Sequence, residues 1–432
     1  MKKRIQKLDK NNLWHPFSQS KNFIDPIIIE TAKNEKLTDI DGNDYVDLIS
    51  SWWVNTHGHC KKEIVESINF QANKLEQVLF SGLTHNPAVT LANELLNILP
   101  NNLSKVFYSD NGSTAVEIAM KVAIQYWYNL GEKKKKFVAL KGGYHGDTFG
   151  SMSVGFSSGY YEPFKDFLLE SRFIPYPEFW NGNNEIEENE SYSFEQADKI
   201  LTENNDDIAA IIIEPLVQGA SGMKMSRKCF VNELVKKFQN AGILVIFDEV
   251  MTGFGRTGKM FATDYLDVKP DIMCLAKSLT GGYIPLAATI FSQKIHQAFC
   301  DDDIKKAFLH GHSYTANPVG CSAAIASINL FDKEKTISKI KKISEIHKEC
   351  LLELSKKLNV SKIRCLGSIA AFDLNKFDKA YGSDDGEKLK KKFLENGLLI
   401  RPIGNTIYLM PPYCIEEDCL YDCYEKIIKI LR

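Results

Sequence analysis

The sequence ILVIFDEV occupies residues 243–250, and PDIMCLAKSLTGG follows at residues 270–282. Each stretch contains a short apolar run that ends at charged side chains: Asp248 and Glu249 in the first, and Lys277 in the second. Short apolar runs of this kind, separated by stretches with helical periodicity, are typical of buried strands in a parallel sheet. The two stretches therefore predict neighbouring strands whose ends carry functional groups.

Three further apolar runs repeat this pattern earlier in the chain. They begin with VFYS at Val106, FVAL at Phe137 and IAAIIIE at Ile208. Because amphipathic helical stretches lie between the runs, the sequence predicts an α/β domain with a mainly parallel central sheet between helices.

A chain of 432 residues is long enough for one large and one smaller domain. We expect residues 75–325 to form the large domain. Residues 1–74 contain the hairpin signal TDIDGNDY at 38–45, and residues 326–432 contain helices and two further strand patterns. These two terminal segments are predicted to build a smaller α+β domain. The polar stretch 181–193 shows no periodicity, which favours a surface loop.

The composition narrows the classes of function. The chain is 44% hydrophobic and 25% charged, with a formal net charge of −2. This balance is typical of a globular protein and provides no basic field for nucleic acid. We find no membrane span and no secretory signal, so we expect a cytoplasmic protein with small-molecule partners. The ten cysteines are then expected to be reduced, and because Cys414, Cys419 and Cys423 lack a fourth ligand nearby, we predict no metal.

A candidate anion site lies in VFYSDNGSTAVEIAMKVAIQYW, residues 106–127, where a strand leads through Gly112 and Ser113 into a long helix. The free amides of a first helical turn bind anions such as phosphate, and Gly112 lets the backbone approach the ligand. Thr114 and Glu117 have the spacing of a capping box. The alternative interpretation is a well-capped helix without a ligand.

Asp248 and Lys277 are candidate catalytic residues because each follows a buried strand. A carboxylate at this position could pair with a protonated ring nitrogen, and the alternatives are solvent or Arg256. A lysine amine held near apolar residues and a cationic cofactor becomes a nucleophile toward an aldehyde. Together with the anion site and the aromatic Tyr144 in a glycine-rich loop, these groups supply what pyridoxal phosphate requires.

A competing motif is GFGRTGK at residues 253–259, which approaches a P-loop. Met260 stands where magnesium binding needs serine or threonine, and five residues separate the preceding strand end from the glycines. Both features oppose a nucleotide-dependent enzyme, which would be a colourless protein that binds ATP with magnesium.

With DEVMTGFGRTG at 248–258 and Lys277 before SLTGG, the chain resembles the class-III, fold-type-I aminotransferases, which use pyridoxal phosphate. The resemblance extends over nearly the whole chain. It is carried by LWHPF at 13–17, SSWW at 50–53, GSTAVE at 112–117, GGYHGDTFG at 142–150, EPLVQGASGM at 214–223, HGHSYTANP at 310–318 and RPIGNTIYLMPPY at 401–413.

The resemblance implies a role for each cofactor-binding residue. Lys277 would hold pyridoxal phosphate as a Schiff base, Asp248 would keep its ring nitrogen protonated, and Tyr144 would pack on the ring. Gly112 and Ser113 would bind its phosphate. These roles make Lys277, Asp248 and Tyr144 the expected catalytic residues.

The resemblance also implies a homodimer with shared active sites. His312 and Ser313 match the loop that completes the phosphate site of the other subunit in this family. The residues that match substrate-binding positions, in addition to Tyr144 and Lys277, are Phe17, Trp52, Gly311 and Arg401, with Asp147 and Arg256 on the amino-donor side. Arg401 is suited to bind a substrate carboxylate.

The paired tryptophans and YLMPPY are narrower signals, shared with family members that convert 8-amino-7-oxononanoate into 7,8-diaminononanoate in biotin biosynthesis. These signals favour S-adenosyl-L-methionine as the amino donor. Two departures from the usual family pattern keep L-lysine open as the amino donor. Phe17 replaces a tyrosine, and His312 with Ser313 replaces Pro-Thr. A variant of the family that uses lysine has a phenylalanine and a similar loop at these positions. An ω-amino-acid aminotransferase of the ornithine or 4-aminobutyrate type is a further alternative.

Overall fold

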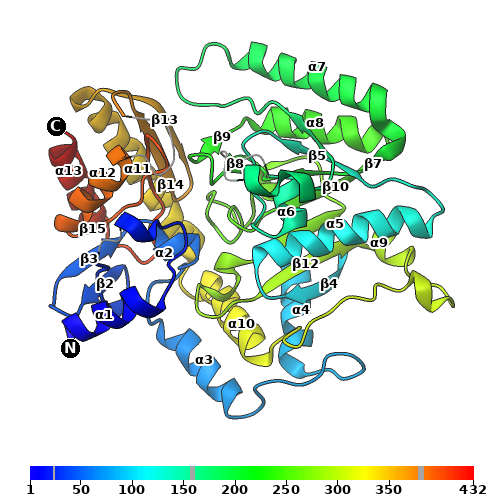
Figure 1. The fold of residues 1–432 in the computed structure, drawn as a ribbon, viewed down its shortest axis with the longest axis horizontal. Coiled ribbons are helices and arrows are strands. Elements are labelled where there is room, and N and C mark those ends of the chain that lie inside the picture. Colours follow the sequence, from blue (N-terminus) through cyan, green and yellow to red (C-terminus); the bar gives the residue numbers. More distant parts are fainter. Residues whose placement is uncertain (23–24, 156–160, 378–383) are drawn as a thin grey trace.

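A seven-stranded sheet forms the centre of the computed structural model, which describes residues 1–22, 25–155, 161–377 and 384–432 (Figure 1). Strand β12 is antiparallel to both of its neighbours, β4 and β11, whereas the other neighbouring strands pair in parallel. The predicted mainly parallel sheet and all five predicted strands are therefore confirmed. In spatial order the strands are β4 (Leu103–Ser109), β12 (Ala287–Ser292), β11 (Ile272–Leu275), β10 (Leu244–Asp248), β7 (Ile208–Ile213), β5 (Lys136–Leu140) and β6 (Ser171–Ile174).

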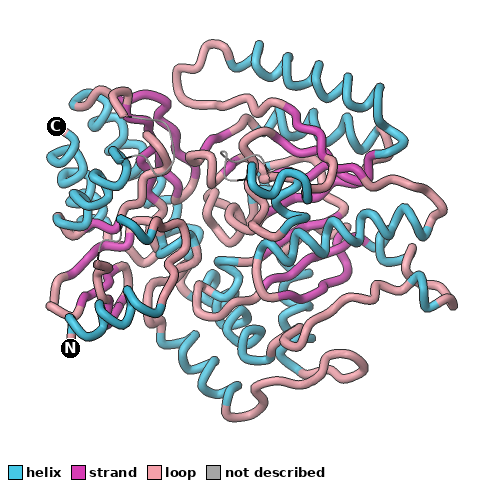
Figure 2. The backbone as a smooth tube through the Cα atoms, in the orientation of Figure 1, coloured by secondary structure: helices cyan, strands magenta, loops and turns pink. Residues whose placement is uncertain are grey.

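Both faces of this sheet are covered by helices, which explains why its central strands are apolar: β7 and β11 at every position, and β10 at every position before Asp248 (Figure 2). Within β10, Val245 and Phe247 pack on the side of α7 (Ile186–Asn204) and α8 (Lys228–Asn240), whereas Leu244 and Ile246 pack on the side of α5 (Gly112–Asn129). Alternate residues of a strand point to opposite faces, so a strand buried on both sides must be apolar throughout. The helices around the large sheet are α3 (Lys62–Ala72), α4 (Asn86–Ile98), α5 (Gly112–Asn129), α6 (Phe149–Ser153), α7 (Ile186–Asn204), α8 (Lys228–Asn240), α9 (Gln293–Gln297) and α10 (Pro318–Lys333).

The two ends of the chain meet in a smaller sheet. Strands β2 and β3 form an antiparallel hairpin, which confirms the turn predicted at residues 38–45, and β15 pairs in parallel with β3. A second small sheet joins β13, β14 and β16 by antiparallel pairing. The boundaries at residues 74 and 325 stay predictions. The strands are β1 (Ile29–Lys33), β2 (Lys36–Asp39), β3 (Asp44–Asp47), β13 (Val360–Leu366), β14 (Ile369–Leu374), β15 (Leu398–Leu399) and β16 (Thr406–Leu409).

The remaining elements are short or lie near the two termini. The helices are α1 (Lys2–Asn12), α2 (Ser50–Trp53), α11 (Thr336–Lys357), α12 (Asp384–Glu395) and α13 (Glu417–Leu431), and β8 (Val217–Gln218) pairs with β9 (Lys224–Met225). The 3₁₀ turns are Ser20–Asn22, Glu162–Phe167, Asn205–Asp207, Ala262–Tyr265, Lys277–Thr280 and Ile304–Lys306. Among the described helices, none combines the length and the apolar character that a membrane span requires.

One prediction was wrong: much of the polar stretch 181–193 belongs to helix α7 rather than to a loop. Ile186, Glu190 and Ser193 are all buried, and their spacing is that of one helical face. Two of these three residues are polar, so a search for apolar periodicity does not find the helix. Glu190 is paired with Arg227, which compensates for its burial.

Candidate active site

Lys277 follows β11 directly and starts a short 3₁₀ turn with φ 44°, a left-handed conformation. Its Nζ lies 4.7 Å from the centroid of the Trp53 ring. Burial lowers the pKa of Lys277, although the negative charges of Asp248 and Glu214 act in the opposite direction. A lowered pKa increases the share of neutral amine, the form that can attack an aldehyde.

Asp248 ends the neighbouring strand β10 and pairs with a buried histidine. Its Oδ2 lies 2.7 Å from His145 Nδ1, and its Oδ1 accepts a hydrogen bond from the Val250 amide at 3.0 Å. Burial alone would lower the pKa of His145, but the hydrogen bond and charge of Asp248 raise it overall. The histidine therefore supports and orients a carboxylate that lines the cavity beside Lys277.

Arg256 lies behind the cavity wall and lines neither of the two cavities described below. It is buried, and its guanidinium donates to Ser50 Oγ at 3.1 Å and to the carbonyls of Trp53 at 3.2 Å and Asn55 at 2.9 Å. Ser50 and Trp53 have φ values of 51° and 65°, and Ser51 between them has φ 61°. Arg256 thus holds a strained turn that carries the two tryptophans, and its predicted contact with the donor stays a prediction.

The cap of helix α5 lies one turn earlier than the sequence indicates. Asn111, not Thr114, is the cap of α5: its Oδ1 accepts from the Thr114 amide at 3.1 Å, and Thr114 Oγ1 accepts from the Asn111 amide at 3.2 Å. Glu117 instead accepts from the Gly150 amide at 2.8 Å and caps the neighbouring helix α6. The predicted Thr114–Glu117 capping box was therefore wrong, because Asn111 already satisfies the first turn.

Neighbouring atoms pack closely against Gly112 and Gly146 at this helix end, so neither position has space for a side chain. A Cβ added to Gly112 would lie 2.6 Å from Val250 Cγ1, and one added to Gly146 would lie 2.3 Å from Ser113 Oγ. Here lies a cavity of about 640 Å³, which we call the inner cavity and whose lining includes Gly112, Ser113, Tyr144, Asp248 and Lys277. Helix amides, an aromatic ring, a carboxylate and an amine thus surround one space, an arrangement that fits pyridoxal phosphate.

Tyr144 is fixed at both of its ends. Its amide donates to Glu214 Oε1 at 3.0 Å, and its hydroxyl donates to Asp147 Oδ2 at 3.0 Å. Glu214 Oε2 also accepts from the Gly219 amide at 3.1 Å, and burial raises the pKa of this carboxyl to about 7. The sequence patterns indicated no role for Glu214 or His145, although both lie in segments that carry the family resemblance.

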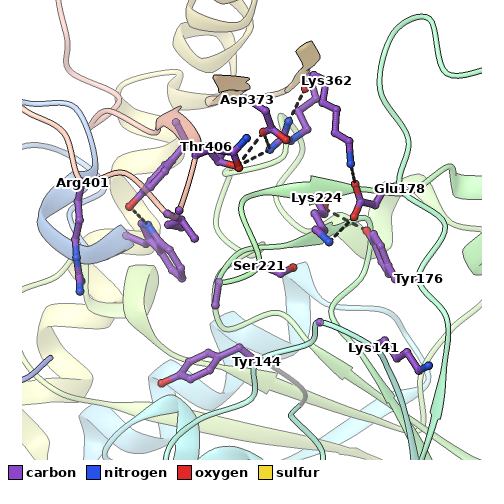
Figure 3. Close-up of a pocket in the computed structure, with 18 of the residues that line it drawn as sticks. Lys141, Tyr144, Tyr176, Glu178, Ser221, Lys224, Lys362, Asp373, Arg401 and Thr406 are labelled. Carbon is purple, nitrogen blue, oxygen red and sulfur yellow. Dashed lines mark hydrogen bonds and ion pairs between the residues drawn. The ribbon is translucent and has the colours of Figure 1, made fainter. Parts of the chain in front are cut away.

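A larger cavity of about 1160 Å³, which we call the outer cavity, shares Trp53, Tyr144, Asp147 and Lys277 with the inner one. On one side of it the Arg401 guanidinium lies 4.3 Å from the Trp52 ring centroid and 5.6 Å from that of Phe17 (Figure 3). The Phe17 and Trp52 centroids are 5.5 Å apart. The structure thus brings Phe17, Trp52, Asp147 and Arg401 together in one cavity.

The segment 311–313 lines neither cavity of its own chain. His312 Nδ1 lies 3.6 Å from Asp110 Oδ2, and the Ser313 carbonyl accepts from Gln77 Nε2 at 2.7 Å. The predicted roles of Gly311, His312 and Ser313 stay predictions, since they involve a substrate or a second copy of the chain.

The alternative motifs have structural explanations. The GFGRTGK segment is packed inside the protein: Phe254 and Arg256 are buried, and a Cβ on Gly255 would lie 2.6 Å from Ile340 Cδ1. The segment does not line either cavity, so it offers no cradle for a nucleotide. Within the described residues no three His, Cys, Asp or Glu side chains are grouped to hold a metal ion.

Comparison with known proteins identifies the family. Residues 18–431 match the family described as aminotransferase class-III. The chain belongs to the class-III aminotransferases. It is 46% identical to the adenosylmethionine-8-amino-7-oxononanoate aminotransferase of Synechococcus elongatus, over 97% of this chain and 98% of the relative. The Staphylococcus aureus protein of the same name is 41% identical, over 94% of this chain and 93% of the relative.

Solved structures of class-III aminotransferases have the same fold. The adenosylmethionine-8-amino-7-oxononanoate aminotransferase of Methanocaldococcus jannaschii superposes with a TM-score of 0.92 at 36% identity, covering 100% of this chain and 99% of that one. An amine transaminase from an uncultivated Pseudomonas species, solved in its PLP-bound internal aldimine form, has a TM-score of 0.91 at 30% identity, with 97% and 98% coverage. The predicted fold type, aminotransferase class and dependence on pyridoxal phosphate are thereby confirmed.

Proposed function

We propose that this class-III aminotransferase converts 8-amino-7-oxononanoate into 7,8-diaminononanoate in biotin biosynthesis, with S-adenosyl-L-methionine as the amino donor. The observation that carries the proposal is the 46% identity, over nearly the full length of both chains, to a relative named for this reaction. The outer cavity supports it, because Trp52, Phe17 and Arg401 provide an apolar wall next to a guanidinium. An acceptor with a long alkyl chain and a terminal carboxylate is complementary to both features.

In this proposal the inner cavity holds pyridoxal phosphate. Gly112 and Ser113 would bind its phosphate, Tyr144 would cover its ring, Asp248 would face the ring nitrogen, and Lys277 would bind its aldehyde carbon. When bound, the cofactor supplies an electron sink for the bonds that break during amino transfer.

The residues of the chain provide the proton transfers. Lys277 Nζ, kept partly neutral by its lowered pKa, removes a proton from the amine-bearing carbon of the donor and later returns one to the acceptor carbon. Asp248, oriented by His145, supplies the negative charge that keeps a proton on a ring nitrogen. Donor and acceptor would enter the same cavity in turn, which predicts ping-pong kinetics.

Substrate recognition is assigned to the outer cavity. Arg401 would bind the acceptor carboxylate, and the rings of Trp52 and Phe17 would pack on its alkyl chain. Asp147, which accepts a hydrogen bond from the Tyr144 hydroxyl, would pair with the ammonium group of a substrate.

We further propose a cytoplasmic homodimer in which His312 and Ser313 complete the phosphate site of the other subunit. Exposed apolar side chains gather on the segments next to these two residues, and contacts such as that between Gln77 and Ser313 join the segments. An apolar surface of this kind is typical of a protein interface. The exposed apolar residues are Leu79, Leu83, Leu309 and Tyr314.

Two alternatives concern the substrates. L-lysine as donor is favoured by Phe17 and by His312 with Ser313, which match the lysine-using variant. A transaminase of simple amines or of ω-amino acids such as ornithine and 4-aminobutyrate is favoured by the structural similarity to amine transaminases at 30% identity and below.

A half-reaction assay tests the proposal. Purified protein with bound cofactor is mixed with each donor, and the loss of cofactor absorbance is followed by its return on addition of 8-amino-7-oxononanoate. We expect S-adenosyl-L-methionine to bleach the protein and 8-amino-7-oxononanoate to restore the absorbance. Bleaching by L-lysine alone would show that L-lysine, and not S-adenosyl-L-methionine, is the amino donor. Turnover of ornithine or 4-aminobutyrate without use of 8-amino-7-oxononanoate would show that the protein is an ω-amino-acid aminotransferase instead.

A further inference from the structure

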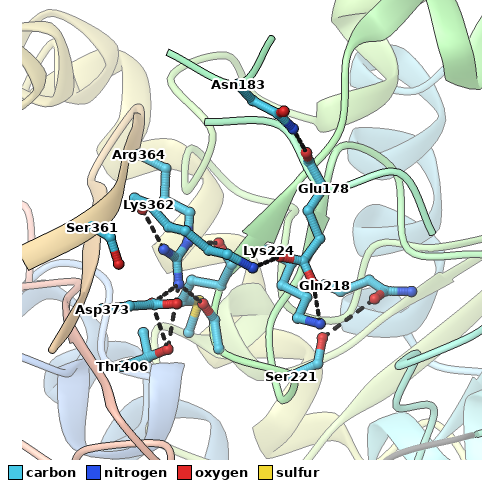
Figure 4. Close-up of polar contacts among 12 residues, drawn as sticks. Glu178, Asn183, Gln218, Ser221, Lys224, Ser361, Lys362, Arg364, Asp373 and Thr406 are labelled. Carbon is cyan, nitrogen blue, oxygen red and sulfur yellow. Dashed lines mark hydrogen bonds and ion pairs between the residues drawn. The ribbon is translucent and has the colours of Figure 1, made fainter. Parts of the chain in front are cut away.

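A group of charged side chains lines the outer cavity away from the residues that it shares with the inner cavity (Figures 3 and 4). Glu178 lies between two lysines: it forms an ion pair with Lys224 of β9 and another with Lys362 of β13, in which Lys362 Nζ lies 2.6 Å from Glu178 Oε2. We call Glu178, Lys224 and Lys362 the outer charged group. It joins the region of the large sheet to the C-terminal hairpin across the cavity.

The outer charged group carries one unbalanced positive charge. Burial alone would raise the pKa of Glu178, but the charges and hydrogen bonds of Lys224 and Lys362 lower it overall, so one carboxylate faces two ammonium groups. Each ammonium group has three N–H donors, and the hydrogen bonds and ion pairs described for the two groups go to Glu178, while Lys362 Nζ also lies 4.6 Å from the centroid of the Trp180 ring. The lysine side chains are 34% and 37% exposed, so the remaining donors are accessible to a ligand.

Arg364 is close by but has a different role. Its guanidinium is almost completely buried and donates to the Met223 carbonyl at 2.9 Å, to Asp373 Oδ1 at 2.9 Å and to the Gly222 and Lys362 carbonyls (Figure 4). These acceptors occupy its donors and neutralise its charge. Arg364 therefore anchors the hairpin that carries Lys362, which holds that lysine at the cavity wall.

We propose that Lys224 and Lys362 form a second carboxylate-binding subsite, which takes the end of a substrate that is remote from the group reacting at Lys277. This inference rests on the proposed transamination. Arg401 and the outer charged group lie on opposite sides of the outer cavity (Figure 3). A ping-pong enzyme must bind two differently shaped substrates at one reacting centre, and two separate cationic positions meet that requirement.

The charge of the subsite indicates a carboxylate rather than a phosphate. A carboxylate brings one negative charge, which the single unbalanced positive charge of the outer charged group neutralises. A phosphate ester brings nearly two charges and would be repelled by Glu178. The carboxylate is either that of the acceptor, which would then bind here instead of at Arg401, or that of a donor such as L-lysine, whose reacting amine would lie at the opposite end of the molecule.

Calorimetric binding of nonanedioate to the cofactor-loaded enzyme tests the subsite, because this dicarboxylate has neither an amine nor a ketone and cannot react. The double variant Lys224→Met/Lys362→Met should bind nonanedioate about tenfold more weakly than the wild type, as expected for the loss of a partly exposed charge contact. Lys199→Met is the matched control, because Lys199 is also paired with a glutamate, Glu203, but does not line either cavity. Equal affinity in the double variant and the control would overturn the proposal.

Glu178→Gln tests the subsite with a change that should strengthen the binding of nonanedioate. This variant leaves both ammonium groups without their carboxylate, so nonanedioate should bind about threefold more tightly. If the ion pairs merely held the two regions together, their loss would weaken binding or leave it unchanged, and either result would argue against the subsite. Circular dichroism of each variant checks that it is folded.

Half-reactions identify the source of the carboxylate. In the double variant, a raised KM for 8-amino-7-oxononanoate alone would assign the subsite to the acceptor, and a raised KM for L-lysine alone would assign it to the donor. Unchanged KM values for both would contradict a role in substrate binding. If the wild type used none of these substrates, the proposed function would fail, whereas nonanedioate binding would still decide whether the subsite exists.

Discussion

Lys277 and Lys362 line the same outer cavity, but their surroundings differ. Lys277 follows a fully buried strand and is surrounded by Trp53, Asp248 and Glu214, and burial lowers its pKa. Lys362 lies on a hairpin, is 37% exposed, and is paired with a carboxylate. Burial in the inner part of the active site thus shifts the pKa of Lys277, whereas the outer part presents the charged side chain of Lys362 to solvent.

The difference extends to how each region is held. In the inner region backbone amides and buried partners fix the side chains, as they do for Tyr144, Asp248 and Glu214. In the outer region one ion pair connects segments that are 184 residues apart in the chain. Substitutions in the inner region should therefore affect chemistry or folding strongly, and those in the outer region should affect mainly the choice of ligand.

The largest effect is expected from Lys277→Ala. Because the variant lacks both the amine that binds the aldehyde and the group that moves the proton, turnover should fall by more than about 10⁴-fold. The fold should persist, because the Lys277 side chain lines the two cavities rather than filling the core. Single-turnover absorbance and circular dichroism measure the two properties, and retained turnover would be incompatible with the assigned role.

Asp248→Asn should lower turnover by about 10²- to 10³-fold, the usual cost of losing one preorganised electrostatic contact. The same change should lower the pKa of His145, because the charge and hydrogen bond of Asp248 raise it. Turnover measurements and an NMR titration of the His145 ring check both effects. An unchanged His145 pKa would show that the pair does not act as described.

Arg256→Met tests the support behind the cavity wall. The variant leaves the buried carbonyls of Trp53 and Asn55 without their donor, so the free energy of unfolding should fall by about 3 kcal/mol. Urea unfolding of the cofactor-loaded protein measures the change. A fall in turnover at unchanged stability would instead favour the predicted contact between Arg256 and the donor.

The raised pKa of Glu214 predicts a dependence of stability on pH. The pKa of Glu214 in the folded protein, about 7, lies above the ordinary value of 4.5, so Glu214 contributes stability that is present below pH 4.5 and is lost as the pH rises to about 7. The free energy of unfolding of the wild type relative to Glu214→Gln should therefore fall by about 2 kcal/mol between pH 5 and pH 7.5. A constant difference in urea unfolding across this range would mean that Glu214 is ionised throughout.

The smallest effect on stability is expected in the outer region. Lys362→Met breaks a partly exposed ion pair, and the free energy of unfolding should change by less than about 1 kcal/mol. Thermal unfolding is a sufficient measurement. A loss as large as that expected for Arg256→Met would remove the distinction between the two regions.

The sequence predicted the inner region better than the outer one, for physical reasons. The ends of buried strands can be recognised from apolar runs, so the positions of Asp248 and Lys277 at neighbouring strand ends could be predicted without coordinates, and their catalytic roles stay predictions. His145 and Glu214 were missed because their roles depend on how loops fold back onto the strand ends.

The outer region leaves no comparable local signal. Lys224 and Lys362 belong to different small sheets, and neither is part of a motif. Glu178 pairs with both only after the two regions have packed. Helix α7 was missed for a similar reason, because Glu190 on its buried face is paired with Arg227, which lies outside the helix.

The identity of the lysine that holds the cofactor is the central claim, and borohydride reduction followed by peptide mass analysis tests it most directly. Reduction of the cofactor-loaded protein makes the link between lysine and pyridoxal phosphate permanent. We predict one modified peptide, with the pyridoxyl group on Lys277. Modification of another lysine, or the absence of any modified peptide in protein that carries the cofactor, would contradict the assignment of the active site.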